Sequence, residues 1–136
     1  MHPCLLDTDA LSEILKQKHP VVAVKASAYL AQYQQFAFSS ISHYEVVRGL
    51  KAKKANRQLQ RFATFRGRSL VFAVTDAILD RAADLWAAAL AAGLPRNDAD
   101  LIIAATALEH GRHLVTGNTA HFSWIPHLVI EDWRQP

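Results

Sequence analysis

The sequence is nearly free of cysteine, which limits the kinds of site that it can build. Cys4 is the single cysteine among 136 residues. One cysteine cannot form a disulfide framework, and no Cys/Cys or Cys/His spacing typical of a zinc site accompanies it. Because Cys4 lies within the apolar run PCLLD, we expect it to be a small buried residue.

Long hydrophobic runs are also absent. No stretch approaches the length that crosses a membrane as a helix. The apolar segment after Met1 is too short for a secretory leader, and acidic residues follow it at once. The sequence therefore predicts no membrane segment and a reducing, cytoplasmic location.

The signature motifs of several enzyme classes are missing. The chain contains no P-loop, no GxGxxG and no GxSxG, so nothing supports a nucleotide-cofactor enzyme or a serine hydrolase. Its composition, 51% hydrophobic and 20% charged, is that of a globular protein. No internal repeat, linker or low-complexity segment divides the chain, and we expect a single domain over residues 1–136.

Strand-like and helix-like segments alternate along the chain. We predict strands at residues 3–7, 36–42, 69–74, 113–116 and 128–133. Helical patterns occupy residues 8–18, 20–35, 43–54, 55–66, 77–93 and 98–111. Strands separated by helices, with no hairpin signal, indicate βαβ units and a mainly parallel sheet. The predicted fold class is α/β, with helices on both faces of the sheet.

Polar side chains gather where the predicted strands end. Asp7 ends the first strand, Glu45 lies in the first turn of the helix after the second, and Asn118 follows the fourth. Asp98 and Asp100 open the helix that runs through LIIAATAL. Because parallel strands end at the same edge of a sheet, we expect these side chains to meet there.

Carboxylates grouped in this way need a compensating charge, because like charges in close contact repel. Oxygen ligands without cysteine favour Mg²⁺ or Mn²⁺, which can polarise a phosphoryl oxygen and activate a water. A simpler explanation exists for Glu45 and Asp98 taken singly, since the helix dipole stabilises an acid in a first turn. Asp7 fits that explanation less well, because an apolar strand gains nothing by ending on an acid. Asp100 also fits it less well, because two carboxylates two residues apart exceed what one helix cap needs.

Other polar residues give weaker signals. The seven histidines show no convincing ligand spacing, and we interpret them as mainly structural. Ser42 and Thr116, at strand ends, could orient the acids or could cap helices.

Acidic residues are absent from a long central stretch. Residues 48–68 contain eight Lys or Arg and no Asp or Glu. Such a block attracts phosphate-rich partners, although a charge run can also be a solvated helix face.

The residues quoted so far resemble those of the PIN-domain ribonucleases, and specifically of the VapC toxins of bacterial VapBC toxin–antitoxin pairs. The similar segments are LLDTDALSEIL, ISHYEVVRGL and DADLIIAATALEHGRHLVTGNTAHFSWIPHLVIEDW. The basic region and DRAADLWAAALAAG are similar in general character only. The resemblance implies a PIN-like three-layer α/β/α sandwich with a parallel sheet of about five strands. It also implies a homodimer and an acidic site for Mg²⁺ or Mn²⁺.

The resemblance also implies roles for single residues. Asp7 and Asp100 would hold the ion directly, and Glu45 would bind it or orient the attacking water. Asn118 stands where the family often has an aspartate, and an amide adds no negative charge, which weakens any claim of a permanently filled site for two metal ions. Asp98 has no firm counterpart, and we interpret it as a helix cap or as an acid that supports the ligands. Thr8 and Asp9 would start the next helix.

The implied activity is metal-dependent hydrolysis of RNA, tRNA or rRNA among the candidates, by the toxin of a type II toxin–antitoxin system that inhibits translation. The implied partner is a VapB-type antitoxin that covers the acidic pocket. The residues expected to follow the RNA backbone are Arg48, Lys51, Lys53, Lys54, Arg57 and Arg61.

Two alternatives come from the same residues. A PIN-like module that binds nucleic acid or assembles complexes without efficient catalysis would explain the uncharged Asn118. A phosphatase with an aspartyl nucleophile would also place acids after the first strand, but it needs a lysine near the fourth strand, and none is there.

Overall fold

Five short strands form one parallel sheet in the computed structural model, which describes residues 1–136 in full. The strand order across the sheet is β3-β2-β1-β4-β5, and every neighbouring pair is parallel. The strands are β1 (Cys4–Leu6), β2 (Ala37–Ser39), β3 (Leu70–Phe72), β4 (His113–Val115) and β5 (Ile130–Glu131). The predicted α/β fold with a parallel sheet of about five strands is confirmed.

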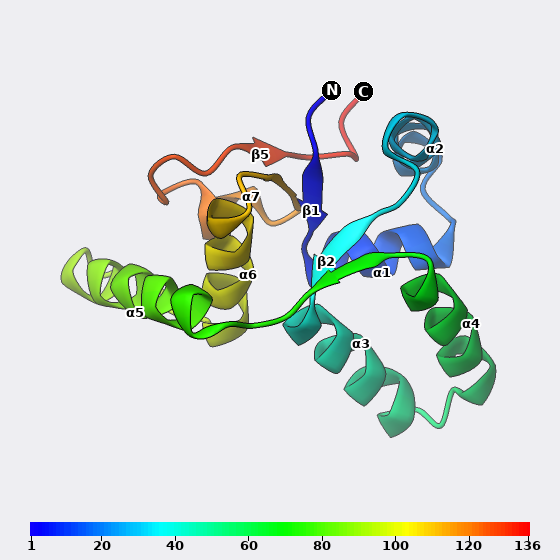
Figure 1. The fold of residues 1–136 in the computed structure, drawn as a ribbon, viewed down its shortest axis with the longest axis horizontal. Helices are drawn as coiled ribbons and strands as arrows, with labels where there is room; N and C mark the ends of the chain where they lie inside the picture. The colour runs from blue at the N-terminus through cyan, green and yellow to red at the C-terminus, as the bar shows by residue number, and fades with distance from the viewer.

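Seven helices connect and cover the strands (Figure 1). They are α1 (Thr8–Lys16), α2 (Pro20–Tyr33), α3 (Ser40–Ala52), α4 (Asn56–Gly67), α5 (Asp76–Ala91), α6 (Asp98–Glu109) and the short α7 (Thr119–Phe122). In Figure 1, α5 and α6 lie on one side of the strands, and α1, α2 and α4 lie on the other. The chain is therefore a three-layer sandwich, as the sequence predicts. No helix combines the length and the apolar character needed to cross a bilayer.

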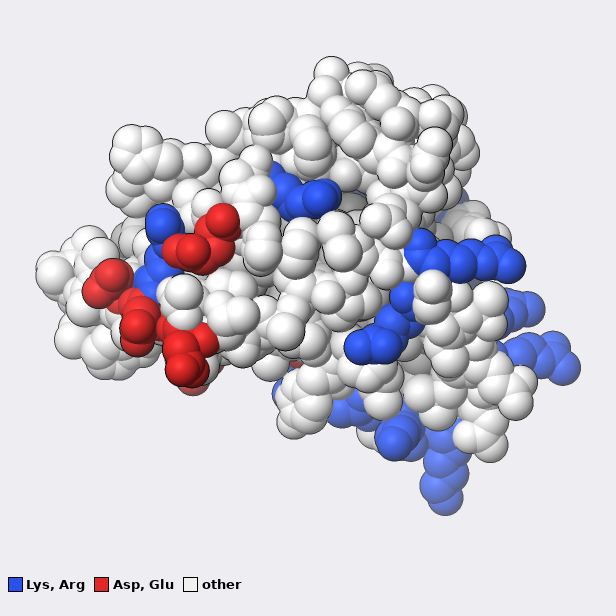
Figure 2. All heavy atoms as spheres, viewed as in Figure 1, with Lys and Arg blue, Asp and Glu red and all other residues white.

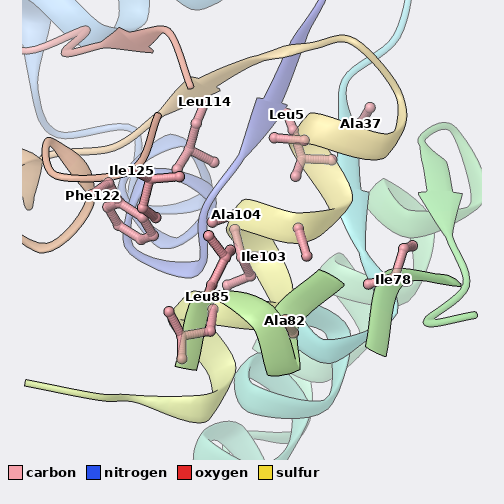
Figure 3. Close-up of a cluster of buried hydrophobic side chains, with 13 residues drawn as sticks. Leu5, Ala37, Ile78, Ala82, Leu85, Ile103, Ala104, Leu114, Phe122 and Ile125 are labelled. Atoms are coloured by element: carbon pink, nitrogen blue, oxygen red, sulfur yellow. The ribbon is translucent and has the colours of Figure 1, made fainter. Parts of the chain in front are cut away.

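Neighbouring strand residues pack into different hydrophobic cores, because successive side chains of a strand point to opposite faces of the sheet. Leu5 of β1 belongs to a core shared with α5, α6 and α7. Figure 3 shows Leu5 and Leu114 from the strands in the same cluster as Leu85 and Ile103 from the helices. Leu6 belongs to the opposite core, shared with α1, α2 and α4. Both faces of the sheet are thus buried, which fits strands that are almost wholly apolar.

The junction between β2 and α3 differs from the prediction. The sequence predicts a strand to residue 42 and a helix from residue 43, but the strand ends at Ser39 and the helix begins at Ser40. Ser39 is the N-cap, and its hydroxyl accepts a hydrogen bond from the Ile41 amide at 3.2 Å. This cap starts the helix early. As a result, Glu45 lies in the second helical turn and not in the first.

Both ends of the chain are attached to α2. The Tyr33 hydroxyl donates to the Met1 carbonyl oxygen at 2.6 Å, and the Lys25 ammonium group donates to the Gln135 carbonyl oxygen. The C-terminal segment is also fixed through Trp133, which is buried in the same core as Leu6. The last residues therefore belong to the folded domain, and they pass close to the edge of the sheet where β1 and β4 end.

Candidate active site

Asp7 follows β1 directly and is the N-cap of α1. Its Oδ1 accepts a hydrogen bond from the Ala10 amide at 2.7 Å, and the residue is only 3% exposed. Burial raises the pKa of Asp7 from 3.8 to about 6, and the charges of Asp9 and Asp100 add to the rise. The nearby Thr116 hydroxyl and the Ala10 amide oppose it. A helix cap needs only an oxygen acceptor, so a buried acid at this position indicates a use for its charge.

Thr8 connects the end of β1 to Glu45 on α3. Its hydroxyl oxygen lies 2.6 Å from Glu45 Oε1 and 3.0 Å from Ser42 Oγ. Because a hydroxyl has a single proton, we assign that proton to the shorter contact with the carboxylate. Ser42, which is fully buried, then donates its own proton to Thr8. The Ser42 hydroxyl therefore supports the Thr8 hydroxyl, and Thr8 in turn holds the Glu45 carboxylate.

Asp100 lies in the first turn of α6. The N-cap of this helix is Asn97, whose Oδ1 accepts from the Asp100 amide at 3.1 Å. The interpretation of Asp98 as the cap is therefore wrong, and Asp98 is the exposed first residue of the helix. Burial raises the pKa of Asp100, and a hydrogen-bond contact with His121, 3.2 Å from Asp100 Oδ2, opposes the rise.

Asn118 follows β4 and pairs with Asp9 of α1. The Asn118 Nδ2 donates to Asp9 Oδ2, and the Asn118 backbone amide donates to Thr116 Oγ1 at 3.0 Å. Asp9 lies close enough to Asp7 and Asp100 to raise the pKa of both. The sequence analysis assigns Asp9 only to the start of a helix, but in the structure its carboxylate lies near those of Asp7 and Asp100.

We call Asp7, Asp9, Glu45 and Asp100 the acidic group. All its potential ligand atoms are oxygens, which fit a hard divalent cation such as Mg²⁺ or Mn²⁺. Burial, with a smaller contribution from neighbouring carboxylates, raises the pKa of Asp7 and of Asp100, and a bound cation would favour their ionised forms. No three Asp, Glu, His or Cys side chains converge closely enough to form a ready-made cation site. Asp7 is the one buried member of the group, and Asp7 and Asp100 are the two whose pKa is raised by burial, which makes them the first candidates to hold an ion.

A basic surface covers α3, α4 and the turn that follows. Its residues are Arg48, Lys51, Lys53, Lys54, Arg57, Arg61, Arg66 and Arg68, and all of them are exposed. Only Arg48 has an acidic partner, Glu45 Oε2 at 3.6 Å. Figure 2 shows lysines and arginines concentrated over α3 and α4, whereas Asp and Glu gather on the side of α5. The positive charge of this surface is therefore largely unneutralised, and Arg48 links it to the acidic group.

The structure brings Asp7, Glu45, Asp100 and Asn118 to one edge of the sheet, where the sequence predicts them. It adds Asp9, Thr8 and His121, which the sequence analysis did not place in the site. His121 stands three residues after Asn118 and lies on the short helix α7. A prediction of that helix would have brought His121 close to the site, but the sequence analysis did not predict α7. Asp9 could have been found because it stands two residues after Asp7, within the same helix start.

A family profile described as PIN domain matches residues 4–126. The chain belongs to the PIN-domain family. The match covers all of the acidic group, and it ends before residues 127–136. Among curated proteins, no sequence matches this PIN domain.

Solved structures with the same fold are chains of toxin–antitoxin complexes. A chain of VapBC2 from Rickettsia felis, bound to a DNA fragment from its promoter, is 27% identical with a TM-score of 0.83, covering 95% of this chain and 97% of the other. A chain of DNA-bound VapBC from Salmonella typhimurium is 26% identical with a TM-score of 0.85, covering 98% and 99%. FitAcB from Neisseria gonorrhoeae, at 24% identity and a TM-score of 0.81 over 98% and 99%, shares the fold.

Proposed function

We propose that this PIN domain is the toxin of a VapBC-type pair and that it hydrolyses RNA phosphodiester bonds with Mg²⁺ or Mn²⁺. The observation that carries the proposal is the acidic group, which three separate elements assemble at the C-terminal edge of the sheet. Its buried Asp7 keeps an acid where a neutral cap would be more stable. The similarity to chains of VapBC complexes over nearly the whole length supports the toxin assignment.

Different residues of the acidic group would have different roles in hydrolysis. Asp7 and Asp100 would hold the ion, which when bound stabilises negative charge on the phosphate and makes a water more nucleophilic. Glu45, fixed by the Thr8 and Ser42 hydroxyls, would bind the ion as well or orient the attacking water. Asn118 contributes no charge itself but holds the Asp9 carboxylate within the acidic group.

Electrostatic attraction to the basic surface would hold the RNA. The six residues predicted from the sequence, Arg48, Lys51, Lys53, Lys54, Arg57 and Arg61, are exposed and lie on α3, α4 and their connection. Neutralising phosphates with such side chains releases counterions, so binding should weaken steeply with salt. The ion pair between Arg48 and Glu45 supports this proposal, because it joins the basic surface to the acidic group.

The partners follow from the same proposal. The chain would be silenced by a VapB-type antitoxin that covers the acidic group, and it would form a homodimer. It would act in the cytoplasm, on tRNA or rRNA, and would inhibit translation. Its expression without antitoxin should therefore arrest bacterial growth, and the same expression of Asp100→Asn should not.

Cleavage of end-labelled bacterial RNA by the purified chain tests the proposal. We expect discrete products with Mg²⁺ or Mn²⁺ that disappear with EDTA and with Asp100→Asn. A folded chain, free of antitoxin, that cuts no RNA with either metal would contradict the nuclease assignment.

A second candidate function is a nucleic-acid-binding or assembly module with a weak site, which the uncharged Asn118 favours. Asp7→Asn separates the two candidates. A nuclease should lose its activity with this substitution, whereas a binding module should keep both its RNA affinity and its biological effect.

A further inference from the structure

A pocket of about 250 Å³ opens beside the acidic group. Its walls come from α1, from the segment after β4 and from the C-terminal residues 132–134. Asp9 and Asn118 line the pocket and also belong to or contact the acidic group, so the two sites share a wall. The C-terminal wall lies beyond residue 126, where the match to the PIN family ends. Arg134 of this wall also lies beyond the segment similar to the VapC toxins, which ends at Trp133.

Arg134 is the cation that this wall contributes, and its guanidinium is fixed on one side. The Arg134 Nε and Nη2 donate to the two carboxylate oxygens of Asp132, each at 3.1 Å. Nη2 also donates to the Gly117 carbonyl oxygen at 2.7 Å. These bonds leave Nη1 without a protein acceptor, and the side chain is 48% exposed. The Nε proton and both Nη2 protons are thereby used, so a guanidinium held in this way presents its Nη1 protons to a ligand with little further loss of freedom.

The Arg134 guanidinium packs closely against Gly117. A Cβ atom at Gly117 would lie 2.8 Å from Arg134 Cζ and 3.0 Å from Nε. The position has no unusual backbone conformation that would itself require glycine. The close approach of Arg134 is therefore the reason that a side chain does not fit here.

The residues around Arg134 anchor the segment that carries it. Trp133 is 6% exposed, and its indole Nε1 donates to Glu131 Oε1 at 3.2 Å. On the other side, Lys25 donates to the Gln135 carbonyl oxygen. Hydrogen bonds of Trp133 and Gln135 thus fix the backbone on both sides of Arg134. Arg134 lies beside Asn118 and near the negative charges of Asp7 and Glu13.

We propose that Arg134 binds a phosphate of the RNA next to the phosphate that is cleaved, and that the pocket holds the nucleotide attached to it. The inference rests on the proposed function and deepens it by naming a substrate-binding residue. A charge-assisted hydrogen bond from the free Nη1 to a phosphate oxygen is the contact that this fixed guanidinium can make. Ala10 and Ile14 of α1, which are half-buried and line the pocket, offer apolar contact to a sugar or base.

The charges around the pocket limit where the phosphate can lie. Asp9 and Glu13 would repel it from the part of the pocket formed by α1, whereas Lys16 and Arg134 are the cations that line the pocket. Asp132 neutralises part of the Arg134 charge but occupies only the Nε and Nη2 edge. The phosphate would therefore sit at the Nη1 edge.

Two substitutions and a matched control test the inference. Arg134→Gln removes the charge, and Gly117→Ala keeps the charge but displaces the guanidinium. Arg81→Gln is the control, because Arg81 on α5 is similarly exposed, at 44%, and also pairs with an acid, Glu109. Binding of fluorescently labelled bulk bacterial tRNA is measured in EDTA from about 50 to about 200 mM KCl. The cleavage rate is measured with Mn²⁺ on bulk bacterial RNA.

We expect Arg134→Gln to weaken binding about tenfold and to reduce the salt slope by about 0.7 to 0.9, the loss of one phosphate contact. Gly117→Ala should weaken binding by a similar factor, and both should raise KM more than they lower kcat. Arg81→Gln should match the parent. Folded variants that bind and cleave like the parent, or that lose no more than Arg81→Gln, would overturn the inference while the nuclease assignment stands. A parent chain that neither binds nor cleaves RNA would overturn both.

Discussion

At the scale of single residues, Asp7 is a buried acid that caps a helix beside other acids. The residue caps α1 and also carries a charge that burial and neighbouring acids disfavour. An asparagine would cap the helix equally well and would carry no charge. We therefore infer that the acid serves the proposed chemistry of the site rather than the stability of the fold. Thr8, the first residue of the same helix, donates its hydroxyl proton to Glu45.

Asp7→Asn should stabilise the metal-free protein at pH 8 by about 1 to 2 kcal/mol. The pKa of Asp7 is raised from 3.8 to about 6 on folding, so its contribution to stability is present below pH 3.8 and is lost as the pH rises through 6. The full loss is about 3 kcal/mol, of which burial of the new amide group offsets a part. Urea unfolding in EDTA at pH 8 measures the gain, which should shrink at pH 5. An unfolding free energy below that of the parent at pH 8 would contradict this account of Asp7.

Thr8→Val should slow RNA cleavage by about tenfold to a hundredfold, because Glu45 loses its short hydrogen bond and is no longer oriented. Thr8→Ser keeps the hydroxyl and is the matched control. The unfolding free energy of Thr8→Val should fall by only about 1 to 2 kcal/mol, chiefly because Ser42 loses its acceptor. Single-turnover cleavage by the three proteins measures the effect. Equal rates for Thr8→Val and the parent would show that the hydrogen bond from Thr8 to Glu45 does not contribute to cleavage.

At the scale of secondary-structure elements, the sequence predicts the alternation of strands and helices and misses where some of them begin. Apolar runs locate all five strands, because both faces of the sheet are buried. The start of α3 is missed because Ser39, a cap, lies within a run of small and aromatic residues that also fits a strand. The α7 helix is missed because four residues are too few to show a helical period.

The basic surface of α4 gives a prediction at this scale. Arg57 and Arg61 are four residues apart on one exposed face of the helix, and neither has an acidic partner. Arg57→Gln with Arg61→Gln should reduce the salt slope of RNA binding by about 0.7 to 0.9 for each lost phosphate contact. Arg81→Gln is again the control. Fluorescence anisotropy at several salt concentrations measures the slope, and an unchanged slope would place the RNA on another surface.

At the scale of the whole molecule, the sheet gathers residues from distant parts of the sequence to one edge. Asp7, Glu45 and Asn118 could be assigned to that edge from the sequence because each follows a strand, and Asp100 because it lies at the start of a helix between two strands. Their detailed contacts could not, because they depend on side chains that meet only in the folded chain, such as Thr8 with Glu45 and Asn118 with Asp9. The place of Arg134 beside Gly117 also arises from tertiary structure alone, since 17 residues separate them.

Calorimetric titration of Mn²⁺ into the metal-free protein tests the central claim, that the acidic group holds a divalent cation. We expect the parent to bind Mn²⁺, and Asp7→Asn and Asp100→Asn each to bind it at least about tenfold more weakly, since each loses a charged oxygen ligand. Asp98→Asn, which changes an exposed acid in the same helical turn as Asp100, should bind like the parent. Equal Mn²⁺ affinity of folded Asp7→Asn, Asp100→Asn and the parent would contradict the account.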